Sequence, residues 1–299
     1  MKKWQYILGF LSLVVITIWL AVITSPRGNL QIIACNVGQG DAFLIQKGNS
    51  QILIDAGPGS KVINCLDQYV AFWDRKIEMV VISHPQKDHY GGLADIFKNY
   101  QVESLLTSGL DSSSSEWGVL ENLVGGTKTK VWYATEVTRL GLDSIYLDIL
   151  HPSKNFVLAN SSLKKSEDQK ILGTFTSDDD PNEFSVVVFL TYGNFNALFT
   201  GDIGKNISEV VAGNFQLQSN TIEYLKVPHH GSKNGLSSRL LDIVNPEVAV
   251  ISAGKNNSYG HPHKEILKML GEKDIRILRT DEMGNVVVET DGEKFWVEK

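Results

Sequence analysis

Six of the seven histidines lie in three short clusters, and this uneven distribution indicates a functional site. The clusters pair His84 with His89, His229 with His230, and His261 with His263. Each cluster follows an apolar, strand-like run and adjoins glycine, and loops at strand ends are where functional side chains are commonly placed. Imidazoles and carboxylates are ligands for Zn2+ and Mn2+, so the clusters predict a metal site.

The segment ISHPQKDHYGGL is the strongest of these motifs. His84, Asp88 and His89 follow a strand-like VVIS run within one turn of loop. Asp88 and His89 are neighbours, so their side chains diverge, and together with His84 they could address two metal ions. The alternative is that Asp88 only caps a helix and that the histidines are incidental.

Three further motifs are weaker when taken singly. Asp202 in LFTGDIG ends an apolar strand, but aspartate beside glycine is common in turns. In LKVPHHGS, one of His229 and His230 could bind a metal while the other faces substrate; the alternative is a loop with two exposed imidazoles. His261, in NNSYGHPH, could be a ligand, a general acid or a phosphate contact.

Two early carboxylates could support the metal ligands. Asp41 in NVGQGDAFLI and Asp55 in LIDAG lie at strand ends. A buried aspartate there could accept a hydrogen bond from a ligating imidazole and fix its orientation. The glycines around Gln39 form neither a dinucleotide fingerprint nor a P-loop, because the remaining residues of those motifs are absent.

Strand-like runs recur between Leu30 and Lys299, with a few helix-like segments between them. Apolar strands of this kind are buried when two sheets pack face to face with helices outside. No second linker is visible in this part of the sequence. We therefore expect an N-terminal anchor and linker over residues 1–28, followed by one domain over residues 29–299.

The segment Trp4–Thr24 contains no charged residue, and it is long enough to cross a bilayer as a helix. Lys2 and Lys3 precede it, and the positive-inside rule then places the N-terminus in the cytoplasm. The sequence thus predicts an uncleaved signal anchor, with the main domain outside the cytoplasm. A cleaved signal peptide and a secreted domain form the alternative.

The composition excludes several classes of protein. With 299 residues, 42% of them hydrophobic, and a mean hydropathy of -0.07, the chain is neither disordered nor a polytopic membrane protein. The net charge of -6 lacks the basic footprint of most nucleic-acid binders, although bound metal ions could supply positive charge locally. Two cysteines are too few for a disulfide scaffold, and we favour Cys35 as a buried free residue over a Cys35–Cys65 bridge.

Taken together, the motifs resemble the metallo-β-lactamase superfamily, and more closely the hydrolase domain of ComEC-family DNA-uptake proteins. The resemblance rests on NVGQGDAFLIQ, ILIDAG, ISHPQKDHYGGL, LFTGD, LKVPHHGS and ISAGKNNSYGHPH, in this order. It implies an α/β fold, a four-layer αβ/βα sandwich, with a metal site at the sheet edges. It also implies a metal-dependent hydrolase with two divalent ions, Zn2+ or Mn2+.

The resemblance also implies site residues. The metal ligands would be His84, Gln86, Asp88, His89, Asp202 and His230. The catalytic residues would be Asp88, His229, His261 and Lys226. In this assignment Asp202 bridges two ions, His261 contacts the scissile phosphate, and Lys226 neutralises phosphate charge.

Two positions depart from the family pattern. Gln86 stands where the family has histidine or aspartate, and Asn36 replaces the aspartate that begins the first motif. Both changes remove negative charge or a strong donor, so we expect weaker metal binding, selectively at one ion. The function expected first is a phosphodiesterase or nuclease with a phosphodiester substrate such as single-stranded DNA. The alternatives are a membrane-anchored binding module with a degraded site, and a lactonase or other ester hydrolase.

Overall fold

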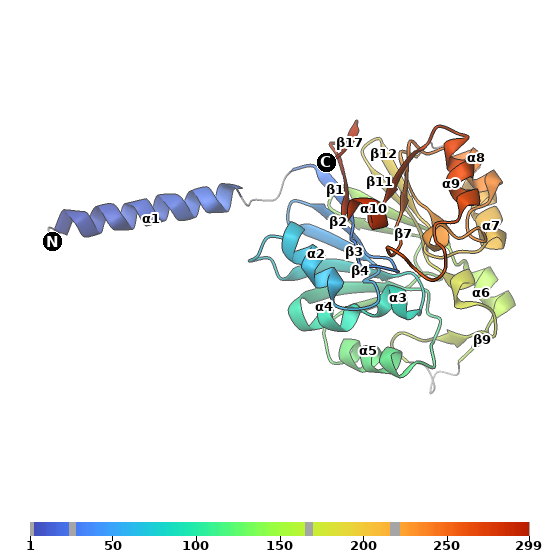
Figure 1. Cartoon of the computed structure of the whole chain (residues 1–299). Coiled ribbons are helices and arrows are strands. Elements are labelled where there is room, and N and C mark those ends of the chain that lie inside the picture. Colours follow the sequence, from blue (N-terminus) through green and yellow to red (C-terminus); the bar gives the residue numbers. More distant parts are fainter. Residues whose placement is uncertain (1–2, 24–27, 165–169, 216–221, 299) are drawn as a thin grey trace.

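The computed structural model describes residues 3–23, 28–164, 170–215 and 222–298, with only the backbone described for 20–23. Two sheets face each other in the body of the molecule (Figure 1). The first has eight strands in the order β17-β16-β1-β2-β3-β4-β5-β6. Their bounds are β1 Leu30–Ala34, β2 Phe43–Lys47, β3 Ser50–Ile54, β4 Lys76–Ile82, β5 Gln101–Thr107, β6 Lys130–Tyr133, β16 Val286–Thr290 and β17 Phe295–Val297.

The second sheet has seven strands in the order β15-β14-β13-β12-β11-β8-β7. Their bounds are β7 Arg139–Leu142, β8 Ile145–His151, β11 Val187–Tyr192, β12 Phe195–Phe199, β13 Tyr224–Lys226, β14 Val248–Ile251 and β15 Arg276–Arg279. In each sheet one half is parallel and the other antiparallel. A separate pair is formed by β9 Ser162–Leu163 and β10 Phe175–Thr176.

Helices cover the outer faces of both sheets (Figure 1). On the first sheet lie α2 Lys61–Tyr69, α4 Leu93–Asn99 and α5 Ser115–Gly125, and on the second α7 Lys205–Phe215, α8 Ser238–Val244 and α9 Lys264–Gly271. Short helices occur at α3 Lys87–Tyr90, α6 Lys154–Asn160, η2 Pro181–Phe184, η3 Pro228–Gly231 and α10 Thr280–Met283. The predicted αβ/βα sandwich is confirmed.

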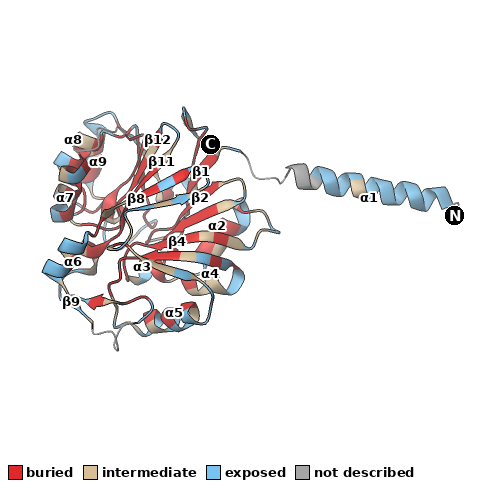
Figure 2. Ribbon diagram, turned by 180° about the vertical axis from the view of Figure 1, so that it is seen from behind, coloured by how far each residue is buried: buried red, intermediate tan, exposed pale blue. Residues whose placement is uncertain are grey.

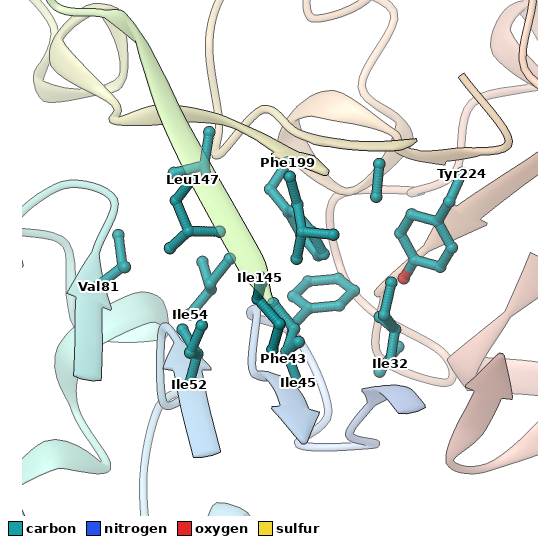
Figure 3. Packing of buried hydrophobic residues seen from close by; sticks show 14 of the residues in the cluster. Ile32, Phe43, Ile45, Ile52, Ile54, Val81, Ile145, Leu147, Phe199 and Tyr224 are labelled. Atoms are coloured by element: carbon teal, nitrogen blue, oxygen red, sulfur yellow. The ribbon is translucent and has the colours of Figure 1, made fainter. Parts of the chain in front are cut away.

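The central core lies between the two sheets, and side chains alternate between it and the outer layers. On β1, Ile32 belongs to the inter-sheet cluster, whereas Ile33 packs with the helices, as the two-residue period of a strand requires. Figure 3 shows Phe43 and Phe199 reaching across this space, and their rings meet edge to face at 5.6 Å. Figure 2 shows that the strands of both sheets consist largely of buried residues, as a core between the sheets and helices outside them require.

One edge of this sandwich collects the loops that carry the histidine clusters. The strand ends at Ala34, Phe43 and Ile54 are in register with one another and with Val81, the last residue but one of β4. The parallel strands β12 and β13 end in the second sheet at Phe199 and Lys226, which are also paired. Residues far apart in the chain are thereby brought to a common edge.

The predicted transmembrane helix is not supported by the structure. The N-terminal segment does form a helix, α1 Lys3–Ile23, which extends away from the two sheets (Figure 1). Within the described residues, no helix combines the length and the apolar character that spanning a membrane requires.

The expectation of a free Cys35 is wrong, because Cys35 and Cys65 form a disulfide. Cys35 follows β1 and Cys65 lies on α2, so the bridge ties the first sheet to a helix that covers it. Cys35 is buried, as the apolar run around it indicated. The pairing depends on how α2 packs on the sheet, which the spacing of the two cysteines does not reveal.

Reducing this disulfide is expected to lower the free energy of unfolding by about 2–4 kcal/mol, because the bridge restricts the unfolded chain. The two cysteines are 30 positions apart, so the released loop is long. The measurement is urea unfolding with and without dithiothreitol. A Cys35→Ala/Cys65→Ala variant is the control and should not respond to the reductant. Equal midpoints for the oxidised and fully reduced protein would contradict the prediction.

Candidate metal centre

The ligand residues reach the common edge from both sheets. His84 follows β4, Asp88 and His89 lie on α3, and Asp202 follows β12. The loop before β2 packs closely against α3: the amide of Asp41 donates to the carbonyl of Asp88 at 3.1 Å. Gly40 has φ +136° and would bring a Cβ into collision with that same carbonyl, so the approach requires glycine.

His229 and His230 lie on η3 in a left-handed backbone conformation, with φ values of 50° and 53°. Such angles are uncommon for residues other than glycine, and each costs about 1–3 kcal/mol, which the surrounding structure must offset. The turn buries His230 and leaves His229 on the wall of a cavity. The doublet is thus divided between the interior and the surface.

Four side chains converge on one point. Oδ2 of Asp202 lies 3.1 Å from Nε2 of His230 and 3.3 Å from Nε2 of His89. Asp88 completes the group, with Oδ2 at 3.4 Å from Nε2 of His230. One donor atom from each of these four residues lies within 4.8 Å of the others. This spacing suits the donor set of a single divalent ion, two imidazoles and two carboxylates.

The far nitrogens of the two imidazoles are held by different partners. Nδ1 of His89 donates to Asp55 at 2.9 Å. Nδ1 of His230 lies 3.2 Å from Oδ1 of Asp41 and donates to the carbonyl of Ser252 at 3.0 Å. The hydrogen bond from His89 to Asp55 is the support expected from the sequence. His230 is held instead by the carbonyl of Ser252, and the oxygens of Asp41 make no hydrogen bond of good geometry in the described part of the chain.

His84 lies beside this group, with its ring centroid 4.2 Å from that of His89. Its Nδ1 is 3.0 Å from the hydroxyl of Ser83 and 3.3 Å from that of Ser185. Burial and the charge on His89 lower the pKa of His84 to about 4, so the ring is neutral at pH 7. Ser83 also donates to Asp55, and sequence analysis missed this serine pair.

Lys226 does not lie where the sequence analysis expected it. The side chain is only 1% exposed and is absent from the wall of the cavity. Its Nζ donates to the carbonyl of Gly201 at 2.6 Å and to Oδ1 of Asp202 at 3.2 Å, and it also contacts Asp41. Lys226 therefore holds one oxygen of Asp202 from behind and leaves Oδ2 to the imidazoles.

The charges in this group explain its pKa values. Burial opposes ionisation of His89, but the carboxylates of Asp202 and Asp55 outweigh it and raise the pKa of His89 well above its usual range. Burial likewise opposes ionisation of Asp202, but His230, His89 and Lys226 hold its pKa well below its usual range. The carboxylates therefore favour a positive charge at the point where the imidazoles meet.

A cavity of about 360 Å³ opens over three of the four ligands, Asp88, Asp202 and His230. Its lining is Gln39, Pro58, Gln86, Lys87, Asp88, Asp202, His229, His230, Tyr259 and His261. Asn257 positions His261 by bonding its backbone on both sides, donating to the carbonyl at 2.6 Å and accepting from the amide at 3.0 Å. Burial and the charge on His230 lower the pKa of His261 to about 4.

The residues present fit a divalent metal ion. The Nε2 atoms of His84, His89 and His230 are buried and make no hydrogen bond of good geometry among the described residues. Unpaired buried polar atoms are costly, and three imidazoles with this property at one place are explained by a missing ligand. Asp88, His89, Asp202 and His230 would hold the ion.

A profile of the metallo-β-lactamase superfamily matches residues 35–255. The chain belongs to the metallo-β-lactamase superfamily. Curated relatives match most of its length, and some are named for competence or recombination. They include ComE operon protein 3 of Bacillus subtilis, 26% identical over 88% of this chain and 33% of that protein. Competence protein ComA of Neisseria gonorrhoeae is 25% identical over 87% of this chain and 32% of that protein.

Among curated relatives, Recombination protein 2 of Haemophilus influenzae is 26% identical over 86% of this chain and 28% of that protein. The chain thus spans about a third of the length of these relatives. A similar solved structure is the metallo-β-lactamase fold protein YhfI of Bacillus subtilis, with a TM-score of 0.54, 12% identity, and coverage of 87% of this chain and 100% of that one.

A second similar structure is CmlA, a diiron β-hydroxylase from Streptomyces venezuelae. Its TM-score is 0.54 at 15% identity, and the match covers 89% of this chain and 55% of that one. The metallo-β-lactamase fold is therefore shared by proteins of different chemistry, and function has to be argued from the site.

His151 lies outside the metal centre of this metallo-β-lactamase domain, at the end of β8. Its Nε2 donates to the carbonyl of Glu183 at 2.7 Å, and burial lowers its pKa to about 4. An unfolded histidine has a pKa near 6.5, so between pH 6.5 and 4 the unfolded chain binds more protons than the folded one. The stability that neutral His151 provides is complete above pH 6.5 and is lost as the pH falls toward 4.

We expect this single group to remove about 2.5 kcal/mol of stability between pH 7 and pH 4.5. The measurement is urea unfolding of the wild type and of His151→Gln, whose amide can still donate to the carbonyl, at both pH values. The variant should lose less stability on acidification than the wild type by this amount. Parallel pH profiles for the two proteins would refute the assignment.

Proposed function

We propose that this metallo-β-lactamase domain is a metal-dependent phosphodiesterase, and that single-stranded DNA is among its substrates. The observation that carries the proposal is the convergence of two imidazoles and two carboxylates, of which Asp88, Asp202 and His230 line an open cavity. The names of two relatives, a competence protein and a recombination protein, favour a nucleic-acid phosphodiester over other esters.

The chain's own residues divide the work. Asp88, His89, Asp202 and His230 would hold the ion, which would supply a Lewis acid for activating water. Asp55 orients His89 by accepting from its Nδ1, and the carbonyl of Ser252 orients His230 in the same way, with Asp41 beside it. Lys226 restricts rotation of the Asp202 carboxylate.

The cavity wall supplies hydrogen-bond donors for the substrate. His261 and His229 lie on this wall, and burial lowers the pKa of both. A neutral imidazole can donate its N–H to a phosphoryl oxygen or to the departing oxygen. In the hydrolysis, water adds its oxygen to phosphorus, the bond to the leaving oxygen breaks, and that oxygen takes up a proton.

The test is hydrolysis of bis-p-nitrophenyl phosphate and of single-stranded DNA with Mn2+ or Zn2+. Turnover that chelation abolishes and added metal restores supports the proposal. Failure to cleave either substrate, with metal shown to be bound, rejects it. Such a result would favour the binding module that was considered from the sequence.

An ester hydrolase, such as a lactonase, is the second candidate. The net charge of -6 favours an uncharged ester over a polyanion. Adding a lactone and p-nitrophenyl acetate to the same assay separates the two functions. Faster turnover of these esters than of the phosphodiester would select the ester hydrolase.

We also propose that the domain acts outside the cytoplasm. The Cys35–Cys65 disulfide supports this location, because disulfides persist in oxidising compartments and are rare in the cytosol. Protease added to intact protoplasts is expected to degrade the domain. A domain that survives this treatment but is degraded after lysis would overturn the location.

A further inference from the structure

The metal centre has two sides, one around His89 and His230 and the other around His84, and they differ in the donor atoms that they offer to a metal ion. Asp88, His89, Asp202 and His230 place one ligand atom each within 4.8 Å of the others. Within the described residues, His84 belongs to no group of three or more histidine, cysteine, aspartate or glutamate side chains of this kind. One side is therefore complete for a single ion, while the other rests on one imidazole.

The surroundings of His84 offer little to a second cation. Its Nδ1 is engaged by the hydroxyls of Ser83 and Ser185, so its unpartnered Nε2 is the single donor atom that this ring can offer to an ion. Gln86, two residues along the chain, lines the cavity and ends in a neutral amide. An amide carbonyl carries no charge and binds a divalent cation more weakly than a carboxylate or an imidazole does.

Asp202 offers no further help on this side. Its Oδ2 faces His89 and His230, and its Oδ1 accepts from Lys226 at 3.2 Å. The ammonium group behind Oδ1 also places a positive charge next to the cluster. A second ion would have to compete with this hydrogen bond and with that charge.

We propose that the chain holds one divalent ion tightly, at Asp88, His89, Asp202 and His230, and that Gln86 leaves the His84 side one strong donor short. The affinity for a second ion should then be lower than that for the first by about 10–100-fold or more. Loss of one supporting partner lowers the affinity of metal sites by this range. This stoichiometry differs from the two ions that the resemblance implies. It concerns metal binding alone and does not require a particular substrate.

The experiment measures bound metal in the absence of substrate. The full chain is loaded with Mn2+, dialysed against metal-free buffer and analysed by elemental analysis, and a calorimetric titration gives the affinities. The wild type should retain one equivalent, and Gln86→His should retain two. The Mn2+ electron paramagnetic resonance spectrum should change from that of an isolated ion to that of a coupled pair.

Two variants serve as controls. Gln86→Asn keeps a neutral amide and should stay at one equivalent. His84→Ala removes the lone imidazole and should keep the tight ion with unchanged affinity, which tests the assignment even if Gln86→His fails to fold.

The inference is overturned by two tightly held ions in the wild type, by none, by a folded Gln86→His that stays at one, or by loss of the tight ion from His84→Ala. The outcome is separate from that of the cleavage assay. A chain that binds one ion and cleaves no phosphodiester loses the proposed function and keeps this stoichiometry.

Discussion

Asp202→Asn should abolish metal retention and hydrolysis while leaving the fold intact. Its Oδ2 faces both imidazoles of the cluster, and the substitution removes the charge without changing the shape of the side chain. Loss of an outer partner of a metal site costs about 10–100-fold in affinity or activity, so loss of a carboxylate that touches both histidines should exceed that range. Elemental analysis and hydrolysis of bis-p-nitrophenyl phosphate measure the two effects.

A matched control for this variant is Asp148→Asn. Asp148 is ion-paired with Arg139 on β7 and β8, outside the lining of the metal cavity. The Asp148→Asn variant should retain metal and activity at wild-type levels. If Asp202→Asn also retained its ion and its rate, Asp202 would not be a ligand and the site would have to be reassigned.

Lys226→Met should destabilise the metal-free protein by about 3–5 kcal/mol, the usual cost of removing one partner of a buried ion pair. The ammonium contacts Asp41 and Asp202, both buried, and methionine would leave these carboxylates without their compensating charge. Urea unfolding in the presence of a chelator measures the loss. The effect should be among the largest of any single substitution in the domain.

A double-mutant cycle separates this charge effect from simple repacking. Asp41→Asn removes one of the two carboxylates, so Lys226→Met should cost less in that background than in the wild type. Equal costs in both backgrounds would mean that the lysine acts through its methylene chain and not through its charge.

Much of this architecture could be predicted from local sequence patterns. The alternation of Ile32 and Ile33 between two cores follows from strand geometry, and the histidine clusters after apolar runs correctly indicated a shared edge. Asp55 was expected to support an imidazole, and it accepts from His89. These predictions depend on residues close together in the chain, or on the rule that strands in register bring their ends together.

Predictions that depended on packing between elements distant in the chain were wrong at two places, the cysteine pairing and Lys226. The Cys35–Cys65 pairing requires the placement of α2 on the sheet, which no short-range pattern encodes. The burial of Lys226 did carry a signal: it lies two residues after Tyr224, whose ring is in the inter-sheet core, so the strand period points both side chains inward. Charge alone suggested contact with phosphate, but strand geometry placed the lysine inside.

The direction of β1 has a practical consequence. Leu30 pairs with Lys47 at one edge of the first sheet, while Ala34 and the loop to Asp41 lie at the other, where the cavity opens. A bead, surface or fusion partner attached ahead of Leu30 would therefore sit at the far end from the mouth. Large polymers should still reach the ligands of a protein immobilised in this way, which makes N-terminal attachment the better geometry for binding assays.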